Sequence, residues 1–184
     1  YGDHRDLHLS IRRQRQMCIR DRMLFGSILL AISAKVQVPF WPVPMTMQTF
    51  VIFLIGMTYS VRLSFATVAF YLFQGAIGLP VFAAGGGVAY LVGPTAGYLY
   101  GMLFASIVIS YLANLGFSKT YFKATVSLLI GSAIIFSFGI IYLGYIIGFE
   151  KAVAAGLLPF IPSELFKIAL AVALIPTLHK IITK

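Results

Sequence analysis

Residues 124–149 form a run of 26 residues without a single Asp, Glu, Lys or Arg. A helix needs about 20 consecutive apolar residues to cross the hydrocarbon core of a bilayer. The rest of the chain has the same character, since 60% of its residues are hydrophobic and only 10% are charged. A soluble domain carries about 25% charged residues, because its outer surface must be wet. The pattern therefore predicts an integral membrane protein that uses lipid as its solvent.

Six apolar segments, separated by charged or by glycine- and proline-rich breaks, predict an all-α integral membrane protein. The segments are residues 23–34, 45–61, 63–79, 90–115, 124–149 and 165–178. We expect them to form one compact bundle of about six transmembrane helices, in a single domain over residues 23–184. Six spans place both termini on one side, where five Lys and Arg residues fall, against three on the other side. This excess predicts cytoplasmic termini by the positive-inside rule.

Nine of the nineteen charged side chains lie in the first 22 residues. Residues 12–22 read RRQRQMCIRDR, which resembles translated sequencing-adapter read-through. The segment also lacks the apolar core of a secretory signal peptide. We expect residues 1–22 to be a non-native or disordered basic segment; the alternative is a native basic arm on the cytoplasmic side. Because the charge is concentrated there, the net charge of +9 does not indicate nucleic-acid binding.

Sequence motifs of catalysis and metal binding are missing. The chain has no GxxxxGK[ST] loop for nucleotide hydrolysis and no HExxH or CxxC motif for a metal ion. His179 is the only histidine after residue 22, so no Ser–His pair has an obvious place inside the bundle. We therefore expect no catalytic residue, no metal site and no cofactor.

When the charges of the loops and termini are set aside, Glu164 and Lys167 are the ionisable residues that stand out near membrane depth. They are three residues apart, so they share one face of a helix. They follow the proline-containing start of the last segment. The pair has two interpretations of about equal weight: an interfacial ion pair of little energetic value, or the polar end of a substrate cavity. Ionisable groups that enter a membrane bundle are usually functional or paired inward.

Five further residues are candidates for lining such a cavity. Gln48 needs a hydrogen-bond partner if it points inward. Gly85 and Gly86 either form a flexible connection or bring backbone N–H groups close to a ligand, which residues without a Cβ permit. Phe82 and Tyr98 flank this glycine-rich stretch and could supply apolar walls, although aromatic residues in membrane helices more often serve plain packing.

Ser27 and Ala31 have the small-xxx-small spacing that lets membrane helices approach closely. This spacing is common and, taken alone, is weak evidence for a contact with another protein.

Four ordered motifs resemble the BioY family, the biotin-binding S components of energy-coupling factor (ECF) vitamin transporters. They are PVPMTMQT at residues 42–49, YLFQGAIGLPVF at 71–82, GPTAGY at 93–98 and LPFIPSELFK at 158–167. Four motifs in order with the right separations are much more specific than any one of them. Glu164 stands where the family usually has Asp, and Ala96 and Trp41 are further departures.

The resemblance implies a six-helix bundle in the cell membrane of a prokaryotic-type cell, with an extracytoplasmic-facing pocket for biotin. By this match, Glu164 would accept hydrogen bonds from the ureido N–H groups and Lys167 would help to hold the valerate carboxylate. The implied partners are membrane lipid, a transmembrane coupling protein and two cytoplasmic ATPases. With such partners, the face of the first helix that carries Ser27 and Ala31 would be the contact with the coupling protein. The alternatives are an S component for a different vitamin and, less favoured, a small integral-membrane enzyme.

Overall fold

Helices make up most of the computed structural model, which describes the backbone of residues 3–39 and 42–182 and the side chains of residues 18–39 and 42–175. In chain order the elements are α1 (Asp3–Lys35), β1 (Gln37–Val38), β2 (Met45–Thr46), α2 (Gln48–Thr58), α3 (Val61–Ala76), α4 (Val88–Leu91), α5 (Ala96–Asn114), η1 (Phe117–Lys119), α6 (Tyr121–Ile147), α7 (Phe149–Gly156) and α8 (Phe160–Ile182). The prediction of a mainly helical fold is confirmed.

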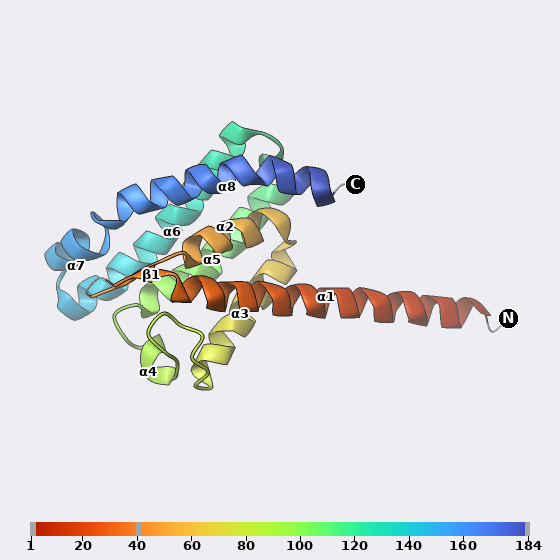
Figure 1. The fold of residues 1–184 in the computed structure, drawn as a ribbon, viewed down its shortest axis with the longest axis horizontal. Coiled ribbons are helices and arrows are strands. Elements are labelled where there is room, and N and C mark those ends of the chain that lie inside the picture. Colours follow the sequence, from red (N-terminus) through yellow and green to blue (C-terminus); the bar gives the residue numbers. More distant parts are fainter. Residues whose placement is uncertain (1–2, 40–41, 183–184) are drawn as a thin grey trace.

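The longer helices form a bundle with two different ends (Figure 1). At one end, which we call the terminal end, α1 begins, α8 ends, and α2 connects to α3. At the opposite end, which we call the loop end, lie α4, α7 and the short antiparallel pair β1–β2. The loop end therefore collects the segments that interrupt the helices.

The closest packing in the bundle is between α5 and α6. A Cβ atom added to Gly97 would come within 2.5 Å of the Phe138 carbonyl oxygen, and one added to Gly101 within 2.8 Å of the Ile135 Cα. The two glycines are four residues apart, so they lie on one face of α5 and let its backbone rest directly on α6. This contact fixes the neighbouring side chains of α5, among them Tyr98, against α6.

Large apolar side chains cover the outside of the bundle, whereas small hydroxyl groups lie inside it. Tyr145, Phe122 and Phe166 are mostly exposed, while Ser64 and Thr67 are fully buried. This arrangement suits a lipid solvent, in which helices associate through small and hydrogen-bonding residues rather than through apolar contrast. By length and composition, α5 and α6 are able to cross a membrane. The described part of α8 and α7 pass the same test only together, as a pair bent by 47° that is either one broken span or a re-entrant loop.

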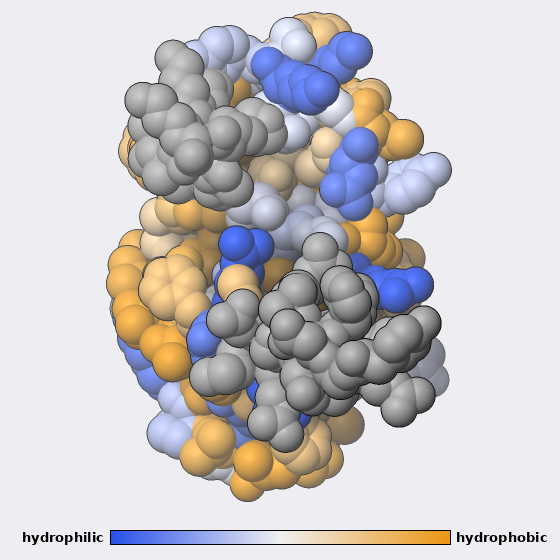
Figure 2. Space-filling model, turned by 90° about the vertical axis from the view of Figure 1, so that its right-hand side faces the viewer, coloured by the Kyte–Doolittle hydropathy of each residue, from blue (hydrophilic) through white to orange (hydrophobic). Residues whose placement is uncertain are grey.

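Exposed basic side chains gather at the terminal end. The exposed basic residues at this end of the bundle include Arg20 and Arg22 of α1, Arg62 of α3, Lys119 of η1 and Lys123 of α6. Figure 2 looks at this end and shows hydrophilic surface between flanks of hydrophobic surface. The two ends of the bundle therefore differ in charge as well as in architecture.

Two details of the fold differ from the sequence prediction. The segment 90–115 is broken into α4 and α5, with Pro94 in the break, because proline disrupts a helix interior. The last helix begins at Phe160, within the proline-containing start predicted for it, and Pro162 lies in its first turn, where proline is tolerated. The strand pair, in which Gln37 lies opposite Thr46, was not predicted. Trp41, noted above as a departure from the family, lies outside the described residues.

Helix α1 is continuous from Asp3 to Lys35 and so includes most of the segment predicted to be non-native or disordered. The origin of that segment stays a prediction. Ser27 is completely buried, and a Cβ added to the adjacent Gly26 would meet the Thr67 side chain of α3 at 2.6 Å. The small residues therefore serve the packing of α1 on α3 within the chain. This placement corrects the expectation that Ser27 contacts a partner; Ala31 is half-buried.

The connection between α3 and α4 is anchored by one buried aromatic ring. Phe82 is fully buried, packs edge-on against Tyr71 at 5.4 Å and stacks on Tyr90 at 5.0 Å between ring centroids. Its ring occupies the space where Gly75 would carry a side chain, since an added Cβ would lie 2.0 Å from the ring. Lys35 donates a hydrogen bond of 2.8 Å to the Phe82 carbonyl oxygen. The loop is thus held against both α3 and the end of α1.

We expect Gly75→Ala to lower the free energy of unfolding by about 1–3 kcal/mol, the usual cost of overpacking a core. Alanine normally favours a helix over glycine, so a loss would report the contact with Phe82. Thermal unfolding in detergent measures the effect. Gly93→Ala is the matched control, because its added Cβ would lie 3.4 Å from the nearest atom, an ordinary contact. Equal stability of the two variants would contradict the anchoring role of Phe82.

Candidate substrate-binding site

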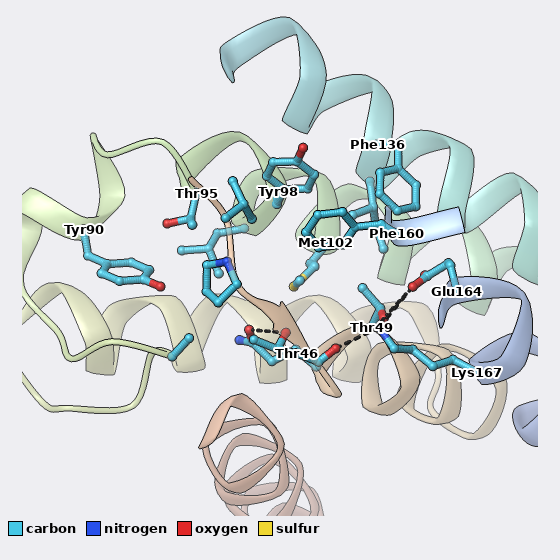
Figure 3. A pocket seen from close by; sticks show the side chains of 16 residues that line it. Thr46, Thr49, Tyr90, Thr95, Tyr98, Met102, Phe136, Phe160, Glu164 and Lys167 are labelled. Atoms are coloured by element: carbon cyan, nitrogen blue, oxygen red, sulfur yellow. Dashed lines mark hydrogen bonds and ion pairs between the residues drawn. The ribbon is translucent and has the colours of Figure 1, made fainter. Parts of the chain in front are cut away.

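A cavity lies where α2, α5, α6 and α8 meet (Figure 3). Its lining includes residues of β2, of α4 and of the loop before α4, so it lies toward the loop end of the bundle. The space inside it that is open to the centres of water-sized molecules is about 40 Å³. The lining residues come from β2, α2, α4, α5, α6, α8 and the connections before them: Val43, Pro44, Thr46, Gln48, Thr49, Ala83, Tyr90, Thr95, Tyr98, Leu99, Met102, Ile135, Phe136, Phe160, Glu164 and Lys167.

Glu164 is 4% exposed and its carboxylate is held by three side chains. Thr49 of α2 donates to Oε2 at 3.0 Å, and Ser132 of α6 donates to Oε1 at 2.9 Å. Lys167 Nζ lies 3.2 Å from Oε2. Three helices thus converge on one carboxylate, which satisfies the rule that a buried charge must be paired and hydrogen-bonded.

Lys167 is also 4% exposed, and its ammonium group has three acceptors. Besides the carboxylate of Glu164, these are the Thr46 carbonyl oxygen at 2.8 Å and Thr49 Oγ1 at 3.0 Å. A lysine has three N–H donors, so all of them are used. Glu164 Oε1, by contrast, accepts one hydrogen bond from the described residues, that of Ser132, and has a second lone pair available for a ligand donor.

Gln48 extends the polar wall from α2. Its Oε1 accepts a hydrogen bond of 3.0 Å from Thr46 Oγ1, and its Nε2 donates one of 2.6 Å to the Tyr71 hydroxyl. The side chain lines the cavity although it is only 4% exposed. One wall of the cavity is therefore a continuous band of hydrogen-bonding groups.

The opposite wall is apolar and largely aromatic. Tyr98, Phe136 and Phe160 surround one corner, with ring centroids 6.2–6.4 Å apart. Met102 lies beside them on the same side of the cavity (Figure 3). The Tyr98 hydroxyl donates a 2.8 Å hydrogen bond to the Gly156 carbonyl oxygen, which ties α5 to the end of α7. Figure 3 shows the ion pair at one end of the cavity and Tyr90 with Thr95 at the other.

The structure brings four of the seven predicted substrate-binding residues to the cavity: Gln48, Tyr98, Glu164 and Lys167. The other three, Phe82, Gly85 and Gly86, shape the adjacent loop instead. Phe82 is the buried anchor described above, and Gly85 forms a bridge with it at φ +138°. A Cβ on Gly86 would meet the Leu79 carbonyl oxygen at 2.0 Å. Their neighbour Ala83 is the loop residue that lines the cavity.

Several lining or supporting residues were missed by sequence reasoning. Thr46 and Thr49 lie inside the motif PVPMTMQT, so the motif itself was the signal that could have found them. Ser132 lies in the charge-free run of α6, where a serine is unremarkable, and only its 2.9 Å contact identifies it. Phe136 and Phe160 are likewise two of many aromatic residues. Among the described residues, no group of three His, Cys, Asp or Glu side chains could hold a metal ion.

A mainly helical bundle with an apolar outer surface, and with a cavity that has one polar and one aromatic wall, is typical of a membrane protein that binds a small molecule. The chain belongs to the BioY family, whose family model matches residues 13–184. The resemblance seen in the sequence is thereby confirmed. Membership of this family also makes the chain a transport protein rather than an enzyme, as predicted.

The relatives include a probable biotin transporter BioY of Rickettsia prowazekii, 37% identical over 148 residues, which covers 80% of this chain and 76% of the relative. The biotin transporter BioY of Thermotoga maritima is 36% identical over 155 residues, covering 83% and 90%. A crystal structure of the S-component for biotin from an ECF-type ABC transporter is similar with a TM-score of 0.80 and 25% identity, covering 91% of this chain and 93% of that one.

We expect Thr49→Val to lower the free energy of unfolding by about 1.5–3 kcal/mol, the scale of a hydrogen bond to a charged group. Valine keeps the shape of the side chain but removes a hydroxyl that donates to Glu164 and accepts from Lys167. Thermal unfolding in detergent measures the loss. Thr125→Val is the control, because the hydroxyl of Thr125 bonds to the Tyr121 carbonyl oxygen of its own helix. A loss no greater than that of the control would contradict the role of Thr49.

Proposed function

We propose that this chain is the substrate-binding subunit of a vitamin uptake transporter and that it captures biotin in the cavity beside Glu164 and Lys167. The observation that carries the proposal is a buried ion pair, fully hydrogen-bonded, at one end of a cavity whose other wall is aromatic. The relatives are named as biotin transporters, which supports biotin as the substrate.

The chemistry of biotin matches the two walls of the cavity. Its ureido ring carries two N–H donors and one carbonyl acceptor, its sulfur-containing ring is apolar, and a valerate chain ends in a carboxylate. The available lone pair on Glu164 Oε1 suits a ureido N–H group. The sulfur-containing ring of biotin suits the wall formed by Phe136, Phe160 and Met102, since sulfur and the edges of aromatic rings attract each other.

We propose that Lys167 acts on the ureido ring through Glu164, whose carboxylate it holds in place, rather than by binding the valerate carboxylate, because its three N–H donors are taken by Glu164, Thr49 and Thr46. Lys167 Nζ and Glu164 Oε2 are only 3.2 Å apart. The ureido ring and the carboxylate lie at opposite ends of biotin, so one extended molecule cannot place both of them at this pair. The carboxylate then points away from the ion pair, toward the end of the cavity where Tyr90 and Thr95 lie.

We further propose that α1, α2, α3, α5, α6 and the α7–α8 pair each cross the cell membrane, with both termini in the cytoplasm. The exposed basic residues at the terminal end support this orientation by the positive-inside rule. It places the cavity, which lies toward the loop end, on the extracytoplasmic side. Short helices such as α2, with 11 residues, require local thinning of the bilayer or cover by neighbouring helices.

The proposed partners are a transmembrane coupling protein and two cytoplasmic ATPases, because the similar crystal structure is that of a component of an ECF-type ABC transporter. On α1, the face turned away from the bundle carries the exposed apolar residues Phe25, Ile28 and Ile32. We place the contact with the coupling protein on this face, beside the half-buried Ala31. The buried Ser27 is not part of it.

We expect Glu164→Ala and Lys167→Ala each to weaken biotin binding by about 1–3 kcal/mol, or about 5- to 150-fold, because each removes a charge-assisted hydrogen bond. Calorimetric titration of the detergent-solubilised protein measures the affinity, with Lys151→Ala, in the exposed part of α7, as control. If another vitamin bound tightly and the Kd for biotin were no better than millimolar, that vitamin and not biotin would be the substrate. Unchanged biotin affinity in both site variants would refute the site.

Two single-cysteine variants test the orientation in a Cys18→Ser background. A cysteine in place of the exposed Lys151, at the loop end, is expected to react with a membrane-impermeant maleimide in intact cells. A cysteine in place of the exposed Lys119, at the terminal end, is expected to react only after permeabilisation. The opposite pattern would invert the proposed topology without affecting the site.

A further inference from the structure

Tyr71 is a buried residue of α3 that does not line the cavity and yet bonds to a residue that does. It is 1% exposed. Its hydroxyl accepts a hydrogen bond of 2.6 Å from Gln48 Nε2 and donates one of 3.0 Å to the Val81 carbonyl oxygen. Tyr71 therefore connects the polar wall of the cavity with the loop that follows α3.

These bonds fix which way the amide of Gln48 points. A tyrosine hydroxyl has a single hydrogen, and here the Val81 carbonyl takes it, so the hydroxyl can only accept from Gln48. Only the amide nitrogen can donate, which assigns Nε2 to the side of Tyr71. On the other side, Oε1 accepts from Thr46 Oγ1 at 3.0 Å, in agreement with the same orientation.

A fixed amide gives the cavity a donor of defined position. The Nε2 group has two N–H bonds, and in the described part of the chain the structure assigns one of them, to Tyr71. The other is available to an acceptor in the cavity that Gln48 lines. The same network continues through Thr46, whose carbonyl oxygen accepts from Lys167. The amide donor and the ammonium donor are thus held in one hydrogen-bonded frame.

We propose that Tyr71 is a positioning residue for substrate binding: it holds the Gln48 amide with its free N–H toward an acceptor oxygen of the guest. The inference rests on the proposed function, in which that guest is biotin and the acceptor is its ureido carbonyl or carboxylate oxygen. Removal of the Tyr71 hydroxyl frees the amide to rotate, so the donor is lost for part of the time. The ring of Tyr71, which packs on Phe82, is not needed for this role.

A double-mutant cycle with Tyr71→Phe and Gln48→Met tests the proposal by biotin titration of the full chain. Tyr71→Phe keeps the ring and is expected to weaken binding about two- to tenfold, the scale of one hydrogen bond. Gln48→Met, which keeps the length of the side chain, is expected to weaken it at least as much. In the double variant the loss is expected to equal that of Gln48→Met alone, because Tyr71 acts through Gln48.

The cycle separates positioning from a structural role. If Tyr71 mattered only by holding Val81, loss of its hydroxyl would weaken biotin binding equally with and without Gln48. Additive losses in the double variant would therefore overturn the proposal. An unchanged biotin affinity of Tyr71→Phe would overturn it as well. Tyr142→Phe is the matched control, since its hydroxyl donates to the Val92 carbonyl oxygen and neither residue lines the cavity, so its affinity should not change.

A second variant tests the hydrogen bond on the oxygen side of the Gln48 amide. Thr46→Val removes the hydrogen bond to Gln48 Oε1 and is expected to lose its effect in the Gln48→Met background as well. This arm keeps the proposal testable where the tyrosine variant does not fold. Failure of the unsubstituted protein to bind biotin would refute the proposed function together with this inference, whereas normal binding with additive losses refutes the inference alone.

Discussion

The organisation of the cavity depends on the burial of one carboxylate and one ammonium group among membrane helices. Removing an ion from water costs several kcal/mol even after the protein relaxes, and only close pairing with further hydrogen bonds offsets that cost. Glu164 and Lys167 meet this demand with bonds from Thr49, Ser132 and the backbone of Thr46. Because these partners belong to α2, α6 and β2, the ion pair fixes where these elements meet α8.

The loop between α3 and α4 depends on the same kind of constraint on a smaller scale. Its polar backbone must be paired because it lies at the edge of an apolar bundle. Lys35 and Gln37 bond to the carbonyl oxygens of Phe82 and Ala83, and Tyr71 bonds to that of Val81. Three consecutive carbonyls are thus fixed from α1, β1 and α3, and the loop lines one side of the cavity through Ala83.

The apolar wall has a different origin, in the packing of helix backbones. Gly97 and Gly101 bring α5 onto α6, and Gly139 of α6 leaves the space that the Tyr98 ring fills, since a Cβ there would lie 2.3 Å from the ring. The ring is then held by its bond to the Gly156 carbonyl oxygen. Close helix packing therefore produces a rigid aromatic surface that faces the polar wall across the cavity.

The sequence by itself determined the helical membrane character, the family and the pairing of Glu164 with Lys167, because apolar run length and i, i+3 spacing are local properties that the chain order contains. Gln48 and Tyr98 were also found as candidates, since polar and aromatic residues stand out near motif boundaries. Only the tertiary structure decided that Phe82, Gly85 and Gly86 shape the loop instead of lining the cavity, that Ser27 faces inward, and that Ser132 and Tyr71 support the site. The roles of Ser132 and Tyr71 depend on contacts between residues 10 to 32 positions apart, and such contacts are set by helix packing, which leaves no local pattern in the sequence.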